Sequence, residues 1–170
     1  SELRIGFLDD VDLGGPETED QWNQASLPVR NGGLGIRSAA SLANSAFLAS
    51  AARTNDLQSR ILPQPVSTIH EHIIETTLQR WSVQSGTSAP EGVEAHNQKA
   101  WDSKCIKVIK DNLMLNAVDN KDKARLLATQ APHSGDWLFA TPITAIGLRM
   151  SNETIRVAVG IPLGTRLCEP

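Results

Sequence analysis

The run RSAASLANSAFLASAART, residues 37–54, decides the fold class. It is rich in strong helix formers and contains neither glycine nor proline. Four residues at helical spacing share one of its faces: Ala39, Ala43, Ala46 and Phe47. A face made mostly of small side chains lets another helix approach closely. The stretch therefore predicts a long helix packed inside a helical bundle.

Amphipathic stretches follow this run, and turn residues separate them. We expect helices over residues 66–81, 93–115 and 121–131, and one or two helical turns over 18–25. Ser151 is a good N-cap for a last helix through Val159, which Gly160 and Pro162 should end. Residues 85–90 (SGTSAP) form the clearest internal linker, 132–135 (PHSG) a turn, and 137–139 (WLF) an apolar anchor. The expected fold class is mainly α, a bundle of four or five helices.

Composition excludes several classes of protein. The 170 residues are 40% hydrophobic and 21% charged, as in globular proteins. No apolar run approaches the roughly 18 residues that span a bilayer, and the start SELRIGFLDD has acids where a signal peptide is basic. We therefore expect an intracellular chain without membrane contact, in the nucleus or the cytoplasm. Cys105 and Cys168 are too few for a disulfide framework or a zinc site.

Charge is unevenly distributed. The net charge is −3, but residues 1–25 contain seven acids and one arginine, which leaves +3 for residues 26–170. The most basic stretch comprises Lys99, Lys104, Lys107 and Lys110, followed by Lys121, Lys123 and Arg125. Acids at positions 102, 111, 119 and 122 are interspersed with it. The acidic segment 1–25 and the mildly basic segment 26–170 are expected to have different functions.

The chain opens with a predicted β-hairpin at residues 3–13. Apolar residues alternate up to Phe7, and Asp9 and Asp10 fall at the tip. Two adjacent carboxylates held between strands can ligate Mg²⁺ in the two-metal arrangement that activates a 3′-hydroxyl. A short acidic sequence of this kind is, by itself, more often a solvated turn.

Several blocks of sequence point to one family. The run SELRIGFLDDVDLGG (1–15) resembles the active-site hairpin of non-LTR retrotransposon reverse transcriptases, with Phe7 where many relatives have Tyr. Further blocks resemble the same polyproteins in the same order: WNQASLPVRNGGLGIRSA (22–39), ARLLA (124–128), APHSGDWL (131–138), GLRMS (147–151), IRVAVG (155–160) and LGTRLCEP (163–170). Residues 55–100 are the least distinctive part.

The resemblance implies an RNA-directed DNA polymerase in which Asp9 and Asp10 are catalytic and bind Mg²⁺. Polymerases of this kind also need a metal-binding aspartate from an upstream palm strand, and fingers that this chain lacks. In relatives a long stretch separates the active-site hairpin from the tryptophan-led segment, whereas here Gly15 and Trp22 are only seven positions apart. Relatives also continue past the final Cys-Glu-Pro into a Cys/His cluster. We expect a fragment, with residues 1–25 a poorly packed palm remnant and 26–170 a helical thumb-like region.

Two segments are candidates for contact with an RNA/DNA primer-template. The turn Asn31–Gly35 precedes a helix, so the backbone N–H groups of Gly32 and Gly33 could meet a phosphate between Arg30 and Arg37. The alternative is a turn that only lets the chain enter the helix. Lysines along a thumb helix could track a duplex backbone; the candidates are Lys104, Lys107 and Lys110. The alternative there is a solvated helix face.

Other residues have plainer interpretations. His70 and His72 lie on opposite sides of a helix and do not complete a metal-binding motif. The four tryptophans, Trp22, Trp81, Trp101 and Trp137, could stack on bases but are more often core residues.

Two functions remain open from the sequence. One is a reverse-transcriptase fragment, inactive alone, that binds primer-template backbone weakly. The other is a helical scaffold or protein-interaction module without affinity for nucleic acid, whose partner is the rest of a polymerase or another protein. The arrangement of the lysines between residues 99 and 125 separates them, because only the first function needs these lysines on one surface.

We expect the isolated chain not to extend a primer on an RNA template in the presence of Mg²⁺, because two adjacent carboxylates supply only part of a two-metal site. Incorporation of labelled nucleotide checks this. Extension that disappears in the Asp9→Ala variant would overturn it.

Overall fold

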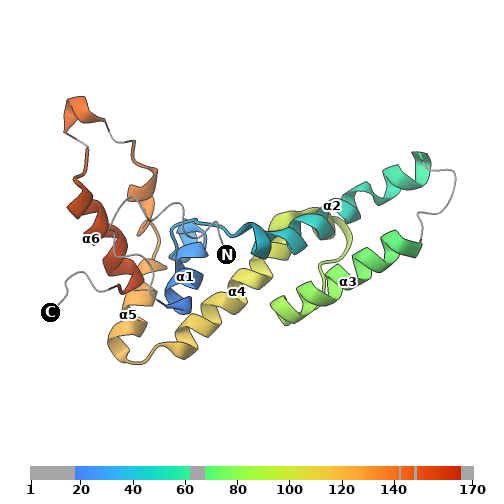
Figure 1. The fold of residues 1–170 in the computed structure, drawn as a ribbon, viewed down its shortest axis with the longest axis horizontal. Coiled ribbons are helices and arrows are strands. Elements are labelled where there is room, and N and C mark those ends of the chain that lie inside the picture. The colour runs from blue at the N-terminus through green and yellow to red at the C-terminus, as the bar shows by residue number, and fades with distance from the viewer. Residues whose placement is uncertain (1–17, 62–67, 142, 148, 166–170) are drawn as a thin grey trace. The chain divides into compact units, whose positions relative to one another are not determined.

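The structure is a computed structural model that describes residues 18–61, 68–141, 143–147 and 149–165 (Figure 1). The α-helices in these ranges are α1 (Glu19–Ser26), α2 (Ala39–Ile61), α3 (Thr68–Ser85), α4 (Gln98–Asn116), α5 (Asn120–Thr129) and α6 (Asn152–Leu163). Short 3₁₀ helices are η2 (Val29–Asn31), η3 (Gly92–His96), η4 (Asp136–Phe139) and η5 (Thr144–Ile146). The mainly α fold class is confirmed. The hairpin predicted at residues 3–13 lies outside the described residues.

The chain forms two compact units. The middle unit is Arg37–Asn112, and the outer unit combines Ser1–Ile36 with Leu113–Pro170. The predicted linker at 85–90 joins α3 to η3 inside the middle unit, where Ala89 packs against the core. Among the described residues, no helix combines the length and the hydropathy needed to cross a membrane.

The middle unit is built around two tryptophans. Trp81 of α3 and Trp101 of α4 are 0% and 4% exposed, and their rings meet edge to face with centroids 4.8 Å apart. The indole N–H of Trp101 donates to the carbonyl of Ala95 at 2.8 Å. Leu48, Ala49 and Cys105 complete the core cluster. The predicted core role is confirmed for Trp81 and Trp101, whereas Trp22 and Trp137 are only half-buried.

The predicted packing face of α2 is wrong. Ser45, Leu48 and Ala49 are buried, whereas Ala39 and Ala43 are exposed. Alanine occurs on nearly every side of this helix, so small-residue spacing does not select one face. The face that packs includes Leu48, which removes more apolar surface from water than an alanine. Phe47 lies at the margin of the core.

The helix predicted from residue 93 is interrupted. Asn97 has an extended backbone (φ −108°, ψ 108°), and its side-chain oxygen accepts a hydrogen bond from the N–H of Lys99 at 3.0 Å. Asn97 therefore caps the start of α4 and separates it from η3. The turn at 18–25 is confirmed as α1, which has a capping box between Thr18 and Gln21.

The last helix begins as predicted, because Ser151 accepts a hydrogen bond from the N–H of Thr154 at 3.1 Å. It does not end at Gly160 or Pro162. Proline in the last turn removes only one backbone donor, and the helix continues to Leu163. Gly164, with φ +70°, then ends it: its N–H bonds to the carbonyl of Ile161, and the N–H of Thr165 bonds to that of Gly160.

The outer unit joins α1, α5 and α6 through Arg125. Its Nη1 donates to the side-chain oxygen of Gln24 at 2.8 Å and to the carbonyl of Pro162. The amide nitrogen of Gln24 also donates to the Pro162 carbonyl, at 2.9 Å. Gln24 and Ala25 are 2% and 0% exposed. Poor packing was expected for residues 1–25; at the end of that range, Gln24 and Ala25 are instead well packed.

Gly33 is required by close backbone packing. A Cβ at this position would lie 2.1 Å from the carbonyl oxygen of Leu27 and 2.6 Å from that of Gln24. Backbone atoms cannot move aside as the end of a flexible side chain can. The turn after η2 therefore sits directly on the C-terminal end of α1.

We expect Gly33→Ala to lower the free energy of unfolding by about 3 kcal/mol, because it overpacks two backbone carbonyls. Gly35→Ala is the matched control: its nearest neighbour would be 3.6 Å away, so only its left-handed backbone (φ +73°) is penalised, by about 1 kcal/mol. Urea unfolding measures both. Equal losses in the two variants would contradict the packing explanation.

Candidate nucleic-acid interface

The lysines of α4 occupy one sector of the helix. At about 100° per residue, the side chains of Lys99, Lys104, Lys107 and Lys110 fall within about 140° of the circumference and along about 16 Å of the axis. The buried residues Trp101, Cys105 and Ile106 fall in the remaining arc. All four lysines belong to the middle unit. We call this sector the lysine face of α4.

Two of these lysines have partners. Lys104 donates to the carbonyl of Ser88 at 2.7 Å, and Lys107 pairs with Asp111 at 2.6 Å. The second pair is exposed, with 74% of the Lys107 side chain and 62% of the Asp111 side chain accessible. Exposed pairs of this kind contribute little stability and exchange readily with solvent and salt. Lys107 can therefore bind a phosphate in place of the Asp111 carboxylate.

Lys121 and Lys123 belong to a different part of the fold. They lie on α5 in the outer unit and are exposed. Arg125, from the same basic stretch, is committed to the contacts with Gln24 and Pro162. The basic stretch of the sequence is thus divided between the two units.

Arg37 is committed to a structural contact. Its Nη2 lies 2.7 Å and 2.8 Å from the two carboxylate oxygens of Asp102, and the side chains are only 25% and 14% exposed. This ion pair fixes the start of α2 to α4 inside the middle unit. Contact of Arg37 with nucleic acid stays a prediction, but it would require breaking a charge-assisted pair.

The turn after η2 has already used its backbone donors. The N–H groups of residues 31–36 donate to the carbonyls of Ala25, Leu27, Pro28 and Val29. Gly32 and Gly33 are also buried. The proposed mechanism, in which these N–H groups meet a phosphate, is therefore not supported by the geometry. Arg30 is exposed, so its side chain is the part of this segment that can reach a ligand.

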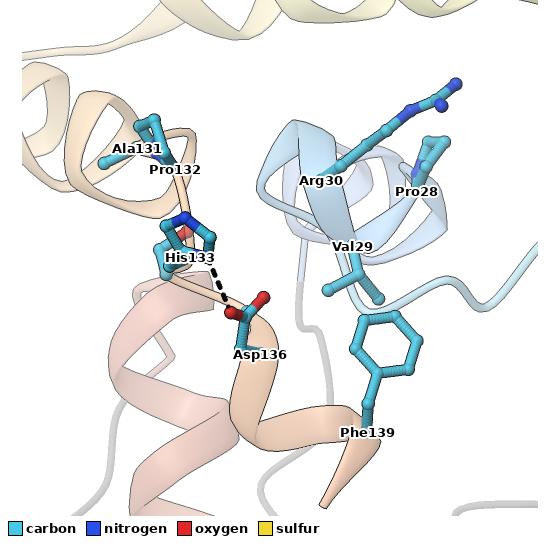
Figure 2. Close-up of a pocket in the computed structure, with 10 residues that line it drawn as sticks. Pro28, Val29, Arg30, Ala131, Pro132, His133, Asp136 and Phe139 are labelled. Carbon is cyan, nitrogen blue, oxygen red and sulfur yellow. Dashed lines mark hydrogen bonds and ion pairs between the residues drawn. The ribbon is translucent and has the colours of Figure 1, made fainter.

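A groove of about 460 Å³ lies beside Arg30 in the outer unit (Figure 2). Its walls are η2 and the segment from Ala131 to Phe139. Figure 2 shows Val29 pointing toward the ring of Phe139 on one side, and the His133–Asp136 pair on the other. Nδ1 of His133 lies 2.8 Å from the Asp136 carboxylate. We call this feature the Phe139 groove.

A second hollow of about 380 Å³ shares Val29, Ser134 and Gly135 with this groove. A Cβ on Gly135 would lie 2.3 Å from Cγ1 of Val29, so the two residues are in close contact. The lining of the second hollow is mostly apolar and includes Leu34, Trp137 and Leu163. Its one charged lining residue, Arg125, is held by Gln24 and Pro162.

The sequence did not single out the Phe139 groove. Residues 137–139 were expected to be an apolar anchor, but Phe139 is 74% exposed. The sequence feature that could have indicated the groove is the turn PHSGD, which places a histidine three residues before an aspartate. In that turn His133 adopts φ +67°, a conformation uncommon for a residue other than glycine.

Cys105 is not a nucleophile in this fold. Burial raises the pKa of its thiol, and the nearby charge of Asp102 acts in the same direction. The thiol is therefore protonated at neutral pH. Cys168, Asp9 and Asp10 lie outside the described residues, so Mg²⁺ binding at the two aspartates stays a prediction. Among the described residues, no cluster of three or more His, Cys, Asp or Glu side chains is arranged to hold a metal, and His70 and His72 belong to none.

Comparison with known proteins gives no assignment. No protein-family model, curated protein or solved structure matches this chain. Function must therefore be argued from the residues themselves.

We expect a double-mutant cycle on Arg37 and Asp102 to give a coupling energy of about 1.5 to 3 kcal/mol, because one guanidinium nitrogen contacts both carboxylate oxygens and the pair is largely shielded from water. The exposed Lys107–Asp111 pair is the control, with an expected coupling of about 0.4 kcal/mol. Urea unfolding of alanine variants measures both cycles. Equal coupling energies would mean that Arg37 is not committed to the fold and can serve a ligand.

Proposed function

We propose that the chain is a non-catalytic helical part of a reverse transcriptase of the non-LTR retrotransposon type, and that it binds the backbone of an RNA/DNA primer-template weakly. The observation that supports this best is the lysine face of α4. Four ammonium groups on one side of a rigid helix can lie along a line of phosphates. The order of the sequence blocks that resemble these polymerases supports the same proposal.

Backbone contact suits this surface better than base recognition. Lysine presents a point charge on a flexible stem, which binds phosphates without selecting a sequence. All four cations of the lysine face are lysines, and the face includes no arginine and no aromatic side chain. We therefore expect binding that is independent of sequence and decreases steeply as salt rises.

The lysine face is small. Asp111 lies in the same sector as the lysines, because it is four residues after Lys107 on the helix. It reduces the local positive charge and competes with a phosphate for Lys107. Four lysines and one aspartate give affinity in the range of non-specific binding, about 10⁻⁴ to 10⁻⁶ M at physiological salt.

A protein-interaction module is the second candidate. It is favoured by large apolar side chains that are more than 80% exposed: Val83, Val93, Leu115 and Val118. Contiguous apolar patches mark protein contacts, whereas single exposed residues are ordinary. Val83 and Val93 belong to the middle unit, and Leu115 and Val118 to the outer unit. This module would have no affinity for nucleic acid, so the same titration separates the two candidates.

We expect a fluorescein-labelled RNA/DNA primer-template to bind the chain at 25 mM salt and to be released as salt rises, because each displaced phosphate counterion contributes about 0.9 to the slope of log K against log salt. The Lys107→Ala/Lys110→Ala variant should lower this slope by about 2 units. Fluorescence anisotropy measures the binding.

The matched control is Lys121→Ala/Lys123→Ala, which removes the same charge from α5 in the other unit. Equal losses in the two double variants would show that net charge, rather than the lysine face of α4, causes binding. No binding of the unmodified chain at 25 mM salt would overturn the proposal and favour the protein-interaction module.

A further inference from the structure

We infer that the Phe139 groove binds one unpaired nucleotide, with its base on the ring of Phe139 and its phosphate at Arg30. This inference rests on the proposed function only for the class of ligand, since it concerns a different surface and single-stranded rather than paired nucleic acid. The groove belongs entirely to the outer unit, whereas the lysine face of α4 belongs to the middle unit.

The exposed ring supplies a stacking surface. Phe139 is 74% exposed at the end of η4, and Val29 supports it from the opposite wall of the groove (Figure 2). A phenylalanine that is three-quarters exposed adds little to the stability of the fold. Every nucleobase presents a flat π-face, so a single aromatic ring can hold any base without selecting among them.

The groove is lined by one cationic side chain, Arg30, and one carboxylate, Asp136. The carboxylate of Asp136 is engaged by His133 at 2.8 Å. Within the described part of the chain, the guanidinium of Arg30 makes one long bond of 3.4 Å, from Nε to the side-chain oxygen of Asn31. Figure 2 shows Arg30 extending from the rim beside Pro28, away from His133. A ligand with an anionic group at the rim and an aromatic ring over Phe139 fits this arrangement, and a nucleotide has both.

The backbone of His133 is constrained, whereas its pair with Asp136 is exposed, with 85% and 67% of the two side chains accessible. Its backbone lies in the left-handed region at φ +67°, which costs free energy for a residue with a side chain. When Nδ1–H donates to the Asp136 carboxylate, Nε2 is the ring nitrogen left to meet a ligand. We assign His133 a positioning role at the groove, where Nε2 can bond to the sugar or the base edge.

The groove is large enough for one base. Its volume of about 460 Å³ lies within the range of small-molecule sites, roughly 300 to 1,000 Å³. Arg30, His133 and Phe139 of its lining are exposed, so a polynucleotide can enter without being threaded. A nucleotide at the end of a strand or within an unpaired strand meets the groove in the same way.

The test is a titration of fluorescein-labelled single-stranded dT₅ with the full chain, followed by fluorescence anisotropy. Phe139→Ala should weaken binding by roughly 5-fold or more, because it removes the stacking surface. Phe139→Trp should restore or strengthen it, whereas Phe139→Leu, which keeps apolar bulk without a π-face, should not. Circular dichroism verifies that each variant keeps the helical content of the unmodified chain.

Arginine variants test the position of the phosphate. Arg30→Ala should weaken dT₅ binding and lower the salt slope by about 0.7, the value for one phosphate on a single strand. Arg149→Ala is the matched control, since Arg149 is an exposed arginine of the same unit that does not line the groove. Equal effects of the two arginine variants would show that charge alone attracts the strand.

A second arm uses free AMP and UMP, detected by saturation-transfer NMR. Mononucleotide binding lost in Phe139→Ala would identify a nucleotide site in general, whereas Phe139-dependent binding of dT₅ alone would identify a strand site. Both outcomes support the inference. Unchanged dT₅ binding in Phe139→Ala, or binding of a labelled Arg-rich peptide in place of dT₅, would overturn it.

The two proposals fail separately. If duplex binding is absent but dT₅ binding depends on Phe139, the groove is a nucleotide site and the proposed duplex contact is wrong. If duplex binding depends on Lys107 and Lys110 while Phe139→Ala does not change dT₅ binding, the proposed role of the lysine face is supported and the inference about the groove is wrong.

Discussion

The hydrogen bonds of the Arg125 guanidinium are the constraint on which the outer unit depends. One nitrogen of Arg125 bonds both to the side chain of Gln24 in α1 and to the carbonyl of Pro162 in α6. Gln24 in turn bonds to the carbonyl of Gly32 at 3.2 Å. Removing Arg125 takes away the donor to the side-chain oxygen of the buried Gln24, and a buried acceptor left without its donor costs more than the bond itself contributes. Three helices and the turn after η2 are therefore held by a single polar network.

This network also shapes the groove. By fixing the turn after η2 against α1, it places Val29 where its side chain touches Gly135 and faces Phe139. The left-handed His133 turns the chain after α5 so that η4 forms the second wall. The groove exists because hydrogen bonds and glycine contacts hold two short segments side by side.

Arginine and lysine side chains have different roles in this structure. Arg37 and Arg125 form multiple hydrogen bonds inside the two units, as a planar guanidinium with several donors can do at low desolvation cost. The lysines of α4 stay at the surface, since an ammonium group is more strongly hydrated. The positive charge that remains for a ligand is therefore carried by lysines and by exposed arginines such as Arg30 and Arg149.

The sequence by itself determined the helices, because capping residues, helix formers and turn residues act over a few positions. Thr18, Asp119 and Ser151 cap helices through bonds to the N–H three residues later. Asn97 gave the same local signal, but a continuous helix was predicted across it. Tertiary structure alone decided which face of α2 is buried, which arginines are committed, and that Phe139 is exposed. These outcomes depend on contacts between residues far apart in the chain, such as Arg125 with Gln24, and periodicity along one segment carries no information about them.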